Sequence, residues 1–479
     1  MRFIDARPAH DLTYSDVFLV PSRSAVTSRL DVSLAPNDGT PATIPIVSAN
    51  MNSVTGPRLA AALARRGGLG ILPQDMPLQS LDEALHWVKE QPVGYDAALR
   101  FRETDRVADA LAHVPAEEGY GVVVADDAGH LEGAIPAERL ATAMPDAPLV
   151  DFLADPIPSV DIDEVASARG AFDLMVEADL QFAPVVHNGA IVGTISRRGA
   201  LRSTLYAPAV DKRGRLAVGA AIGINGDVAA KARAIVEAGA DVVVLDTAHG
   251  HQEGMLRAVE TVAGLGLGVP IVAGNVVTAA AVRELVHAGA TIIKVGVGPG
   301  AMCTTRMMTA VGRPQFSAVL ETAEAARELG AHVWADGGVR YPRDVALALA
   351  GGAHSVMIGS WFAGTIEAPG AIARDEQGRP FKESWGMAST RAVVERFRRL
   401  DPYELARKML FAEGISSSTI YIDPKRPSIE DLLDMITSGV RSSMTYAGAR
   451  DLRAFHERAV VGVQSAAGYE EGKALPVSW

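Results

Sequence analysis

The chain has 479 residues, 48% of them hydrophobic, and its 45 lysines and arginines against 57 aspartates and glutamates give a formal net charge of −12. This acidic balance argues against a surface that binds nucleic acid. A single cysteine excludes an internal disulfide and a cysteine-cluster metal site. Because no apolar run has the length of a signal-peptide core or a membrane span, we expect a soluble, cytoplasmic protein without a membrane partner.

Eight short apolar runs follow one another along the chain, and most precede a stretch of helical composition. Segments such as AARELG and VALALAGG read as helices that end at glycine. Eight strand–helix units predict an α/β fold with a closed TIM (β/α)8 barrel, which takes about 250 residues and leaves room for a second module. The runs are 45–48, 69–72, 216–222, 241–246, 270–275, 291–298, 332–338 and 355–360.

Residues 92–205 separate the second run from the third and contain an internal repeat. The segments 120–140 and 180–201 each read as a strand, a polar turn with glycine, a strand ending in Gly-x-Ile, and a helix. The repeat resembles a tandem pair of CBS motifs, which implies a regulatory module that binds adenine or guanine nucleotides; a purely structural hairpin insertion is the alternative. We therefore expect a barrel built from 1–91 and 206–479, with the inserted module at 92–205.

Glycines stand where the last two barrel strands should end. Barrel active sites lie at the C-terminal ends of the strands, often with a phosphate bound after strands 7 and 8. The seventh run ends in Asp336, Gly337 and Gly338, and the eighth in Gly359 and Ser360. Glycine lets backbone N–H groups approach phosphate closely, so these ends suggest a phosphorylated substrate, although glycine after a strand is also ordinary turn chemistry.

The sixth run leads into an irregular loop, 294–306, which carries the single cysteine, Cys303. A lone cysteine is most often a small buried apolar residue. Here it stands at the expected catalytic face beside Thr304, Thr305 and Arg306, and an electropositive neighbour favours the thiolate. We therefore interpret Cys303 as a nucleophile.

The loop sequence GVGPGAMCTTR resembles the cysteine-loop signature of IMP dehydrogenases and GMP reductases. Similarity to that family continues along the whole chain, with its blocks in the family's order. These blocks are DLTYSDVFLVPSRS, PIVSANMNSVTG, DTAHGH, AGNVVT, ADGGVR, VMIGSWFAGTIEAPG and WGMAS.

The resemblance implies a role for each matching residue. Cys303 would attack C2 of a purine nucleotide, and Thr305 and Glu413 would transfer protons. The substrate would be bound by Met51, Asp336, Gly337, Gly338, Gly359, Ser360, Gly386, Met387, Ala388 and Gly414. The nicotinamide cofactor would face Asp246, Thr247, Ala248 and Asn275. A potassium ion would be held by Gly298, Gly300, Cys303 and Arg306, the first three through their carbonyls. Ala301 replaces the family's usual serine, so one hydroxyl contact with the phosphate is missing.

The two reactions of this family share a covalent purine–cysteine intermediate and differ in its fate. Dehydrogenases hydrolyse it with an Arg-Tyr pair on a flap, which here spans 389–412 and contains Arg396-Phe397 but no Arg-Tyr dipeptide. The other sequence blocks do not agree on which reaction the chain catalyses. Residues 49–51, 386–389 and 444–449 resemble reductases, whereas residues 246–250, 359–360 and the CBS-like insertion resemble dehydrogenases.

Because the flap carries the distinguishing step, the sequence favours an NADPH-dependent GMP reductase of purine salvage over an NAD-dependent IMP dehydrogenase. A catalytically dead nucleotide sensor is disfavoured, since Cys303, Thr305 and Glu413 are all present. The resemblance further implies GMP and IMP as substrate and product, ATP or GTP at the CBS-like module, and a homotetramer or homo-octamer.

Overall fold

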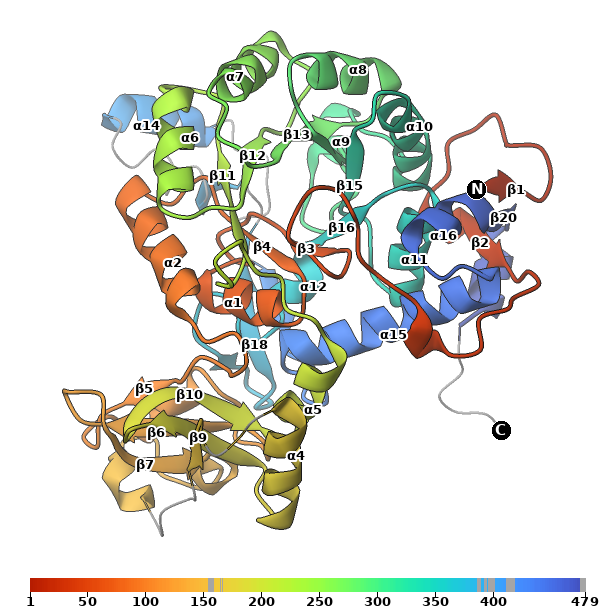
Figure 1. Ribbon diagram of the computed structural model, residues 1–479. Helices are drawn as coiled ribbons and strands as arrows, with labels where there is room; N and C mark the ends of the chain where they lie inside the picture. Colours follow the sequence, from red (N-terminus) through yellow and green to blue (C-terminus); the bar gives the residue numbers. More distant parts are fainter. Residues whose placement is uncertain are drawn as a thin grey trace.

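The computed structural model describes residues 1–153, 159–163, 165, 167–385, 389–391, 394, 401–410 and 418–473. All eight predicted runs form strands of one closed parallel barrel, in the order β11-β12-β13-β14-β15-β16-β3-β4 (Figure 1). The predicted TIM barrel is therefore confirmed. Its strands are β3 Ile46–Ser48, β4 Leu69–Leu72, β11 Val218–Ile222, β12 Val242–Asp246, β13 Ile271–Val276, β14 Ile292–Val295, β15 His332–Asp336 and β16 Ser355–Ile358.

Helices cover the outside of the barrel and bury one apolar stripe each. In α8, for example, Ala281, Val282 and Leu285 share the buried face, and Gly289 follows the helix with φ of +115°. The strands are almost continuously apolar because both of their faces are buried. The covering helices are α1 Pro57–Arg65, α2 Leu78–Glu90, α6 Val228–Glu237, α7 Glu253–Gly264, α8 Ala279–His287, α10 Gln315–Glu328, α11 Pro342–Ala350 and α15 Ile429–Ala447.

The inserted segment folds as two small sheets of the same topology. In each sheet the first strand is parallel, and the third antiparallel, to the middle strand. Both halves then continue into a helix, so the repeat has the order of elements that the sequence predicts. The first half comprises β5 Arg100–Phe101, α3 Val107–Leu111, β6 Gly121–Ala125, β7 Leu131–Pro136 and the 3-10 helix η3 Ala137–Leu140. The second comprises β8 Val160–Asp161, α4 Ala168–Glu177, β9 Phe182–His187, β10 Ala190–Ser196 and α5 Arg197–Leu205.

The insert joins the barrel at the end opposite the C-terminal ends of the strands. Helix α2 returns from the C-terminal end of β4, so the chain leaves for the insert at the N-terminal end of the barrel (Figure 1). Both connections come back to the end of α1. Arg65 Nε donates to the Pro92 carbonyl at 2.9 Å, and Ala209 N donates to the Ala64 carbonyl at 2.8 Å.

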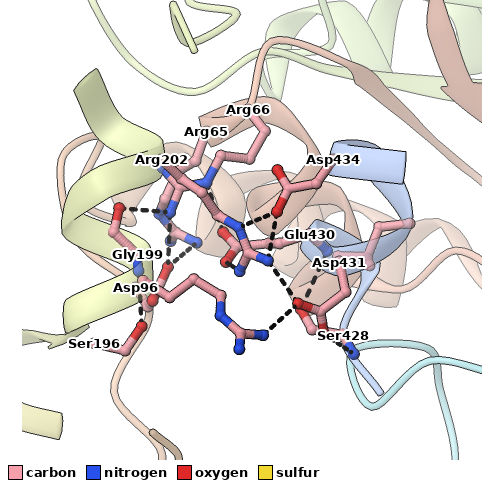
Figure 2. A network of polar contacts seen from close by, with 12 residues as sticks. Arg65, Arg66, Asp96, Ser196, Gly199, Arg202, Ser428, Glu430, Asp431 and Asp434 are labelled. Atoms are coloured by element: carbon pink, nitrogen blue, oxygen red, sulfur yellow. Dashed lines mark hydrogen bonds and ion pairs between the residues drawn. The ribbon is translucent and has the colours of Figure 1, made fainter. Parts of the chain in front are cut away.

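A network of buried charges links helix α5 of the insert to the start of α15 (Figure 2). The Arg202 guanidinium lies 3.0 Å from Glu430, 2.5 Å from Asp431 and 2.7 Å from Asp434. Burial opposes the charge of Arg202, but the neighbouring carboxylates outweigh it and raise its pKa. Arg66 of the barrel shares Glu430, with Nε 2.7 Å from its carboxylate. Paired buried charges therefore hold the insert against the barrel.

A small sheet, made of β17 Ala373–Arg374, β18 Pro380–Ser384 and β19 Ser418–Tyr421, carries the flap. Lys382 of β18 is buried and donates to the carbonyls of Ile366 and Ala368. Within the flap, α14 spans Pro402–Leu410, whereas Arg396-Phe397 lies outside the described residues.

The remaining elements are β1 Arg2–Phe3, η1 Tyr14–Asp16, β2 Val17–Val20, η2 Arg29–Asp31, η4 Leu149–Phe152, α9 Thr305–Thr309, α12 Ser360–Ala363, α16 Leu452–Arg458, β20 Val460–Val463 and α17 Ala466–Glu471. In the described part of the chain, none of the helices combines the length and apolarity needed to span a bilayer.

Candidate active site

A cavity of about 630 Å³ opens at the C-terminal ends of the barrel strands. Most of the residues expected to bind substrate, cofactor or ion line it together. They are Met51, Asp246, Thr247, Ala248, Asn275, Gly298, Gly300, Cys303, Thr305, Asp336, Gly337, Gly338, Gly359 and Ser360. Arg306 is not among the lining residues. Gly386, Met387, Ala388, Glu413 and Gly414 lie outside the described residues.

Cys303 is exposed on the loop between β14 and α9, at the mouth of this cavity. Its backbone N–H donates to the Gly300 carbonyl at 3.0 Å, which turns the loop sharply. The thiol donates to the Thr305 hydroxyl at 3.2 Å. Gly298 has φ of +85°, and a Cβ there would lie 2.2 Å from Cγ of Arg306, so only glycine fits under the Arg306 stem. The Cys303 sulfur and the Thr305 hydroxyl therefore lie next to each other in the lining of the cavity.

The glycine pair after β15 packs closely against the cysteine loop. Gly337 and Gly338 have φ of +86° and +81°, a region that favours glycine. A Cβ on Gly338 would lie 3.2 Å from Cβ of Pro299, and a Cβ on Gly337 would lie 3.3 Å from the Gly300 nitrogen. The exposed Arg340 follows on the same loop and lines the cavity. This end therefore offers accessible backbone and a cation, the features that suit a phosphate.

A buried lysine that lines the cavity links the ends of two barrel strands. Lys294 is only 3% exposed, and its Nζ lies 2.7 Å from Asp246 Oδ1 and 2.8 Å from Asp336 Oδ2. Burial opposes its charge, but the two carboxylates outweigh burial and raise its pKa, so the ammonium stays protonated. Asn275 donates to Asp336 at 2.9 Å, and Asn50 donates to Asp246 at 3.0 Å. Both carboxylates are therefore held rigidly as acceptors.

The loop after β12 is fixed to the end of β13 by backbone hydrogen bonds. Thr247 N donates to the Gly274 carbonyl and Asn275 N to the Thr247 carbonyl, both at 3.0 Å. The Asn275 side-chain oxygen is buried and accepts no hydrogen bond from the described part of the chain. A buried acceptor without a donor is costly, so this oxygen fits a ligand that brings an N–H group.

The sequence matches the IMP dehydrogenase / GMP reductase domain over residues 11–474. The chain belongs to this family. It is 52% identical to a GMP reductase of Mycobacterium tuberculosis H37Rv over 100% of both chains, and 36% identical to an inosine-5'-monophosphate dehydrogenase of Aquifex aeolicus over 98% of this chain and 96% of the relative. A solved cysteine-to-alanine variant of GMP reductase from Trypanosoma brucei, in complex with guanosine 5'-monophosphate, aligns with a TM-score of 0.68 at 30% identity, over 98% of this chain and 99% of that chain.

Members of this family are oxidoreductases that act on GMP or IMP. Besides the site residues expected from the sequence, the structure shows further polar residues in the lining of the cavity, among them Lys294, Asn50 and Arg340. Lys294 was not singled out from the sequence, although a lysine inside an apolar strand is a detectable signal. Asn50 and Arg340 could not be found in the same way, because polar residues after strands are common. Lys294 matters most, since one ammonium joins an expected substrate residue, Asp336, to an expected cofactor residue, Asp246.

Proposed function

We propose that this protein is a GMP reductase, which converts GMP to IMP and ammonia with NADPH as reductant, a step of purine salvage. The main observation behind the proposal is the hydrogen bond of 3.2 Å from the Cys303 thiol to the Thr305 hydroxyl. Both residues line a cavity with one end suited to bind a phosphate and another suited to bind the cofactor. The reductase is favoured over the dehydrogenase because the full-length relative at 52% identity is named GMP reductase, whereas the dehydrogenase is 36% identical. The absence of an Arg-Tyr dipeptide from the flap sequence points the same way.

In the proposed reaction, the cavity first orients the purine nucleotide. The backbone of Gly337 and Gly338, with Arg340, would bind the phosphate, and the Asp336 carboxylate would accept hydrogen bonds from the ribose hydroxyls. Lys294 and Asn275 keep that carboxylate in place. Fixed binding at the phosphate and ribose brings C2 of the purine to Cys303.

The Cys303 thiolate would then attack C2, and the bond from C2 to the exocyclic nitrogen would break with its electron pair on nitrogen. Ammonia is a poor leaving group unless this nitrogen is protonated as the bond breaks, and Thr305, whose hydroxyl accepts from the Cys303 thiol, would deliver the proton. Glu413, the acid that the family resemblance pairs with Thr305, lies outside the described residues. NADPH, when bound, supplies the hydride that C2 receives. Loss of the C2–S bond then returns the thiolate and releases IMP.

The residues present fit a nicotinamide cofactor and a potassium ion. Thr247, Ala248 and the Asn275 side-chain oxygen would hold the nicotinamide end, since this oxygen accepts no hydrogen bond from the described residues and a carboxamide N–H₂ is a suitable donor. The carbonyls of Gly300 and Arg306 each accept one backbone N–H, from Cys303 and Ala310. A second lone pair thus remains on each for the ion, alongside the carbonyls of Gly298 and Cys303. The ion would fix the shape of the cysteine loop.

We further propose that the insert binds ATP or GTP and regulates the barrel. Support comes from its two similar halves and from a second cavity, of about 190 Å³, where insert and barrel meet; Arg58, Arg65, Arg198 and Arg202 line it. Deletion of 92–205 with a short Gly/Ser joint should keep activity and remove any ATP or GTP effect. Regulation that survives the deletion would favour a purely structural insertion.

A ring-forming homo-oligomer, tetramer or octamer, is proposed from the family resemblance. Light scattering at working concentration tests it directly. A species of one chain mass, 50.3 kDa, would exclude it.

The experiment that tests the main proposal compares two reactions of the pure protein while nicotinamide absorbance is followed. Oxidation of NADPH with release of ammonia from GMP is expected. Formation of XMP from IMP and NAD, without NADPH oxidation in the presence of GMP, would instead assign the dehydrogenase reaction. Thr305→Val should slow the reaction, whereas Thr309→Val, on the same helix with its hydroxyl bonded to the Thr305 carbonyl, serves as the control.

A further inference from the structure

The charges that line the active-site cavity are unevenly compensated. The cavity is lined by three cations, Lys231, Lys294 and Arg340, and by three carboxylates, Asp75, Asp246 and Asp336. Lys294 is neutralised by two carboxylates. In contrast, neither Lys231 nor Arg340 forms an ion pair with any residue that the structure describes. Arg340 stands beside the glycine pair at the nucleotide end, and Lys231 is a second cation of the cavity that has no carboxylate partner among the described residues.

The position of Lys231 is not explained by the stability of its helix. It is the fourth residue of α6, Val228–Glu237, near the end where the helix dipole disfavours a cation. Asp227, four residues earlier, caps the helix by accepting from Ala230 N at 2.9 Å. The Lys231 ammonium donates instead to the Asn225 carbonyl at 3.0 Å. A lysine ammonium has three donors, so two remain for a ligand.

Lys231 shares the cavity with the residues of the cofactor end. It follows β11, whereas Thr247 and Ala248 follow the neighbouring strand β12. The nicotinamide end of the cofactor is expected at those two residues, and its phosphates lie elsewhere along the dinucleotide. Lys231 is half-buried and forms no ion pair within the described residues, and such a cation beside the cofactor end matches a phosphate in charge and in donor geometry.

We propose that Lys231 binds a phosphate group of the dinucleotide cofactor and so contributes to cofactor specificity. The proposal rests on the cofactor assigned under the proposed function. Two phosphates share this chemistry: the diphosphate bridge, present in NADH and NADPH alike, and the 2′-phosphate, present in NADPH alone. The two sources predict different effects on the two cofactors.

The test measures binding of NADPH and of NADH to the whole protein without GMP, by quenching of protein fluorescence, so that no turnover is needed. Lys231→Met keeps an unbranched apolar side chain, one atom shorter, and removes the charge. A hydrogen bond to a charged group contributes about 1.5–3 kcal/mol, so we expect affinity to fall about 10- to 100-fold. Lys231→Arg should restore most of the affinity. Lys212→Met, at an exposed position outside the cavity, changes the net charge equally and should have no effect.

Loss of affinity for NADPH alone would identify the 2′-phosphate, and equal losses for both cofactors would identify the diphosphate. Unchanged binding of both cofactors by Lys231→Met, or failure of the unmodified protein to bind either one, would overturn the proposal. GMP binding should be the same in all variants, which also shows that the variants are folded. Cofactor binding without any reduction of GMP would contradict the proposed function and leave the role of Lys231 standing.

Discussion

Replacement of Arg202 by methionine should weaken the contact between the insert and the barrel. The Arg202 side chain is 7% exposed and pairs with Glu430, which is 9% exposed, and Asp431, which is 4% exposed. Its third partner, Asp434, is 41% exposed, so that pair is screened by water and contributes less than about 1 kcal/mol. The effect of the substitution therefore depends on the two buried carboxylates.

Breaking a buried ion pair by removing one partner costs about 3–5 kcal/mol, because the other charge stays buried. After the substitution, however, each carboxylate still has another arginine as a partner: Glu430 pairs with Arg66 at 2.7 Å, and Asp431 pairs with Arg198 at 3.0 Å. We therefore expect the lower end of that range, about 3 kcal/mol. This destabilisation falls on the contact between α5 and α15, so it should favour local opening of that junction over unfolding of the barrel.

Limited proteolysis under native conditions measures such opening. About 3 kcal/mol corresponds to an increase of roughly 10²-fold in the open population, and cleavage between α5 and β11 should accelerate by that factor when reclosing is faster than cleavage. Arg169→Met is the matched control, because Arg169 pairs with Asp173 at 2.9 Å in the same insert but is 76% exposed. If both variants are cleaved at the same rate, the buried network does not hold the insert and the reasoning is wrong.

Three further changes test the site and its surroundings. Cys303→Ala should abolish turnover of either nucleotide and leave binding intact, and thiol labelling of the unmodified protein should be slowed by GMP; rapid labelling in saturating GMP would contradict the nucleophile assignment. Lys294→Met should lower kcat/KM by roughly 10²-fold, because about 3 kcal/mol of support for two carboxylates is lost; steady-state rates near normal would exclude this. Burial, helped by Arg58, lowers the pKa of Lys382 from 10.5 to about 7. The folded protein therefore loses stability as pH falls from about 10.5 to 7, by up to about 5 kcal/mol. In Lys382→Met this pH dependence of the thermal midpoint should be absent, and its persistence would show that the charge of Lys382 is not its cause.

The barrel was predictable because its strands are buried on both faces and are separated by helices with one apolar stripe. The predicted ends were less accurate. The run 291–298 was expected as a strand, yet β14 ends at Val295. The next residue, Gly296, has φ of +148°, and Gly298 has φ of +85°, which takes the chain out of the sheet. Strand β15 likewise ends at Asp336, before the positive-φ glycine pair.

The candidate site was predictable only in part. Residues such as Gly338, two residues after β15, and Cys303, on the loop that follows β14, could be placed because barrel sites lie at the C-terminal ends of the strands. The pairing of Lys294 with both Asp246 and Asp336 could not, because it joins the ends of three different strands. In the insert, the short strands β5 and β8 were missed, since two residues show no alternation of polar and apolar side chains.

The return of both insert connections to the end of α1 has a consequence for the order of folding. Strand β4 pairs with β11, for example Gly70 with Val218, across the whole length of the insert. Closing a flexible loop of about 150 residues costs more entropy than closing one of about 40, by about 0.6 kcal/mol for each doubling of length. A folded insert whose ends meet at Ala64 and Arg65 shortens the loop to the smaller size. Early folding of the insert should therefore lower the barrier to closing the barrel by about 1 kcal/mol and make closure several-fold faster.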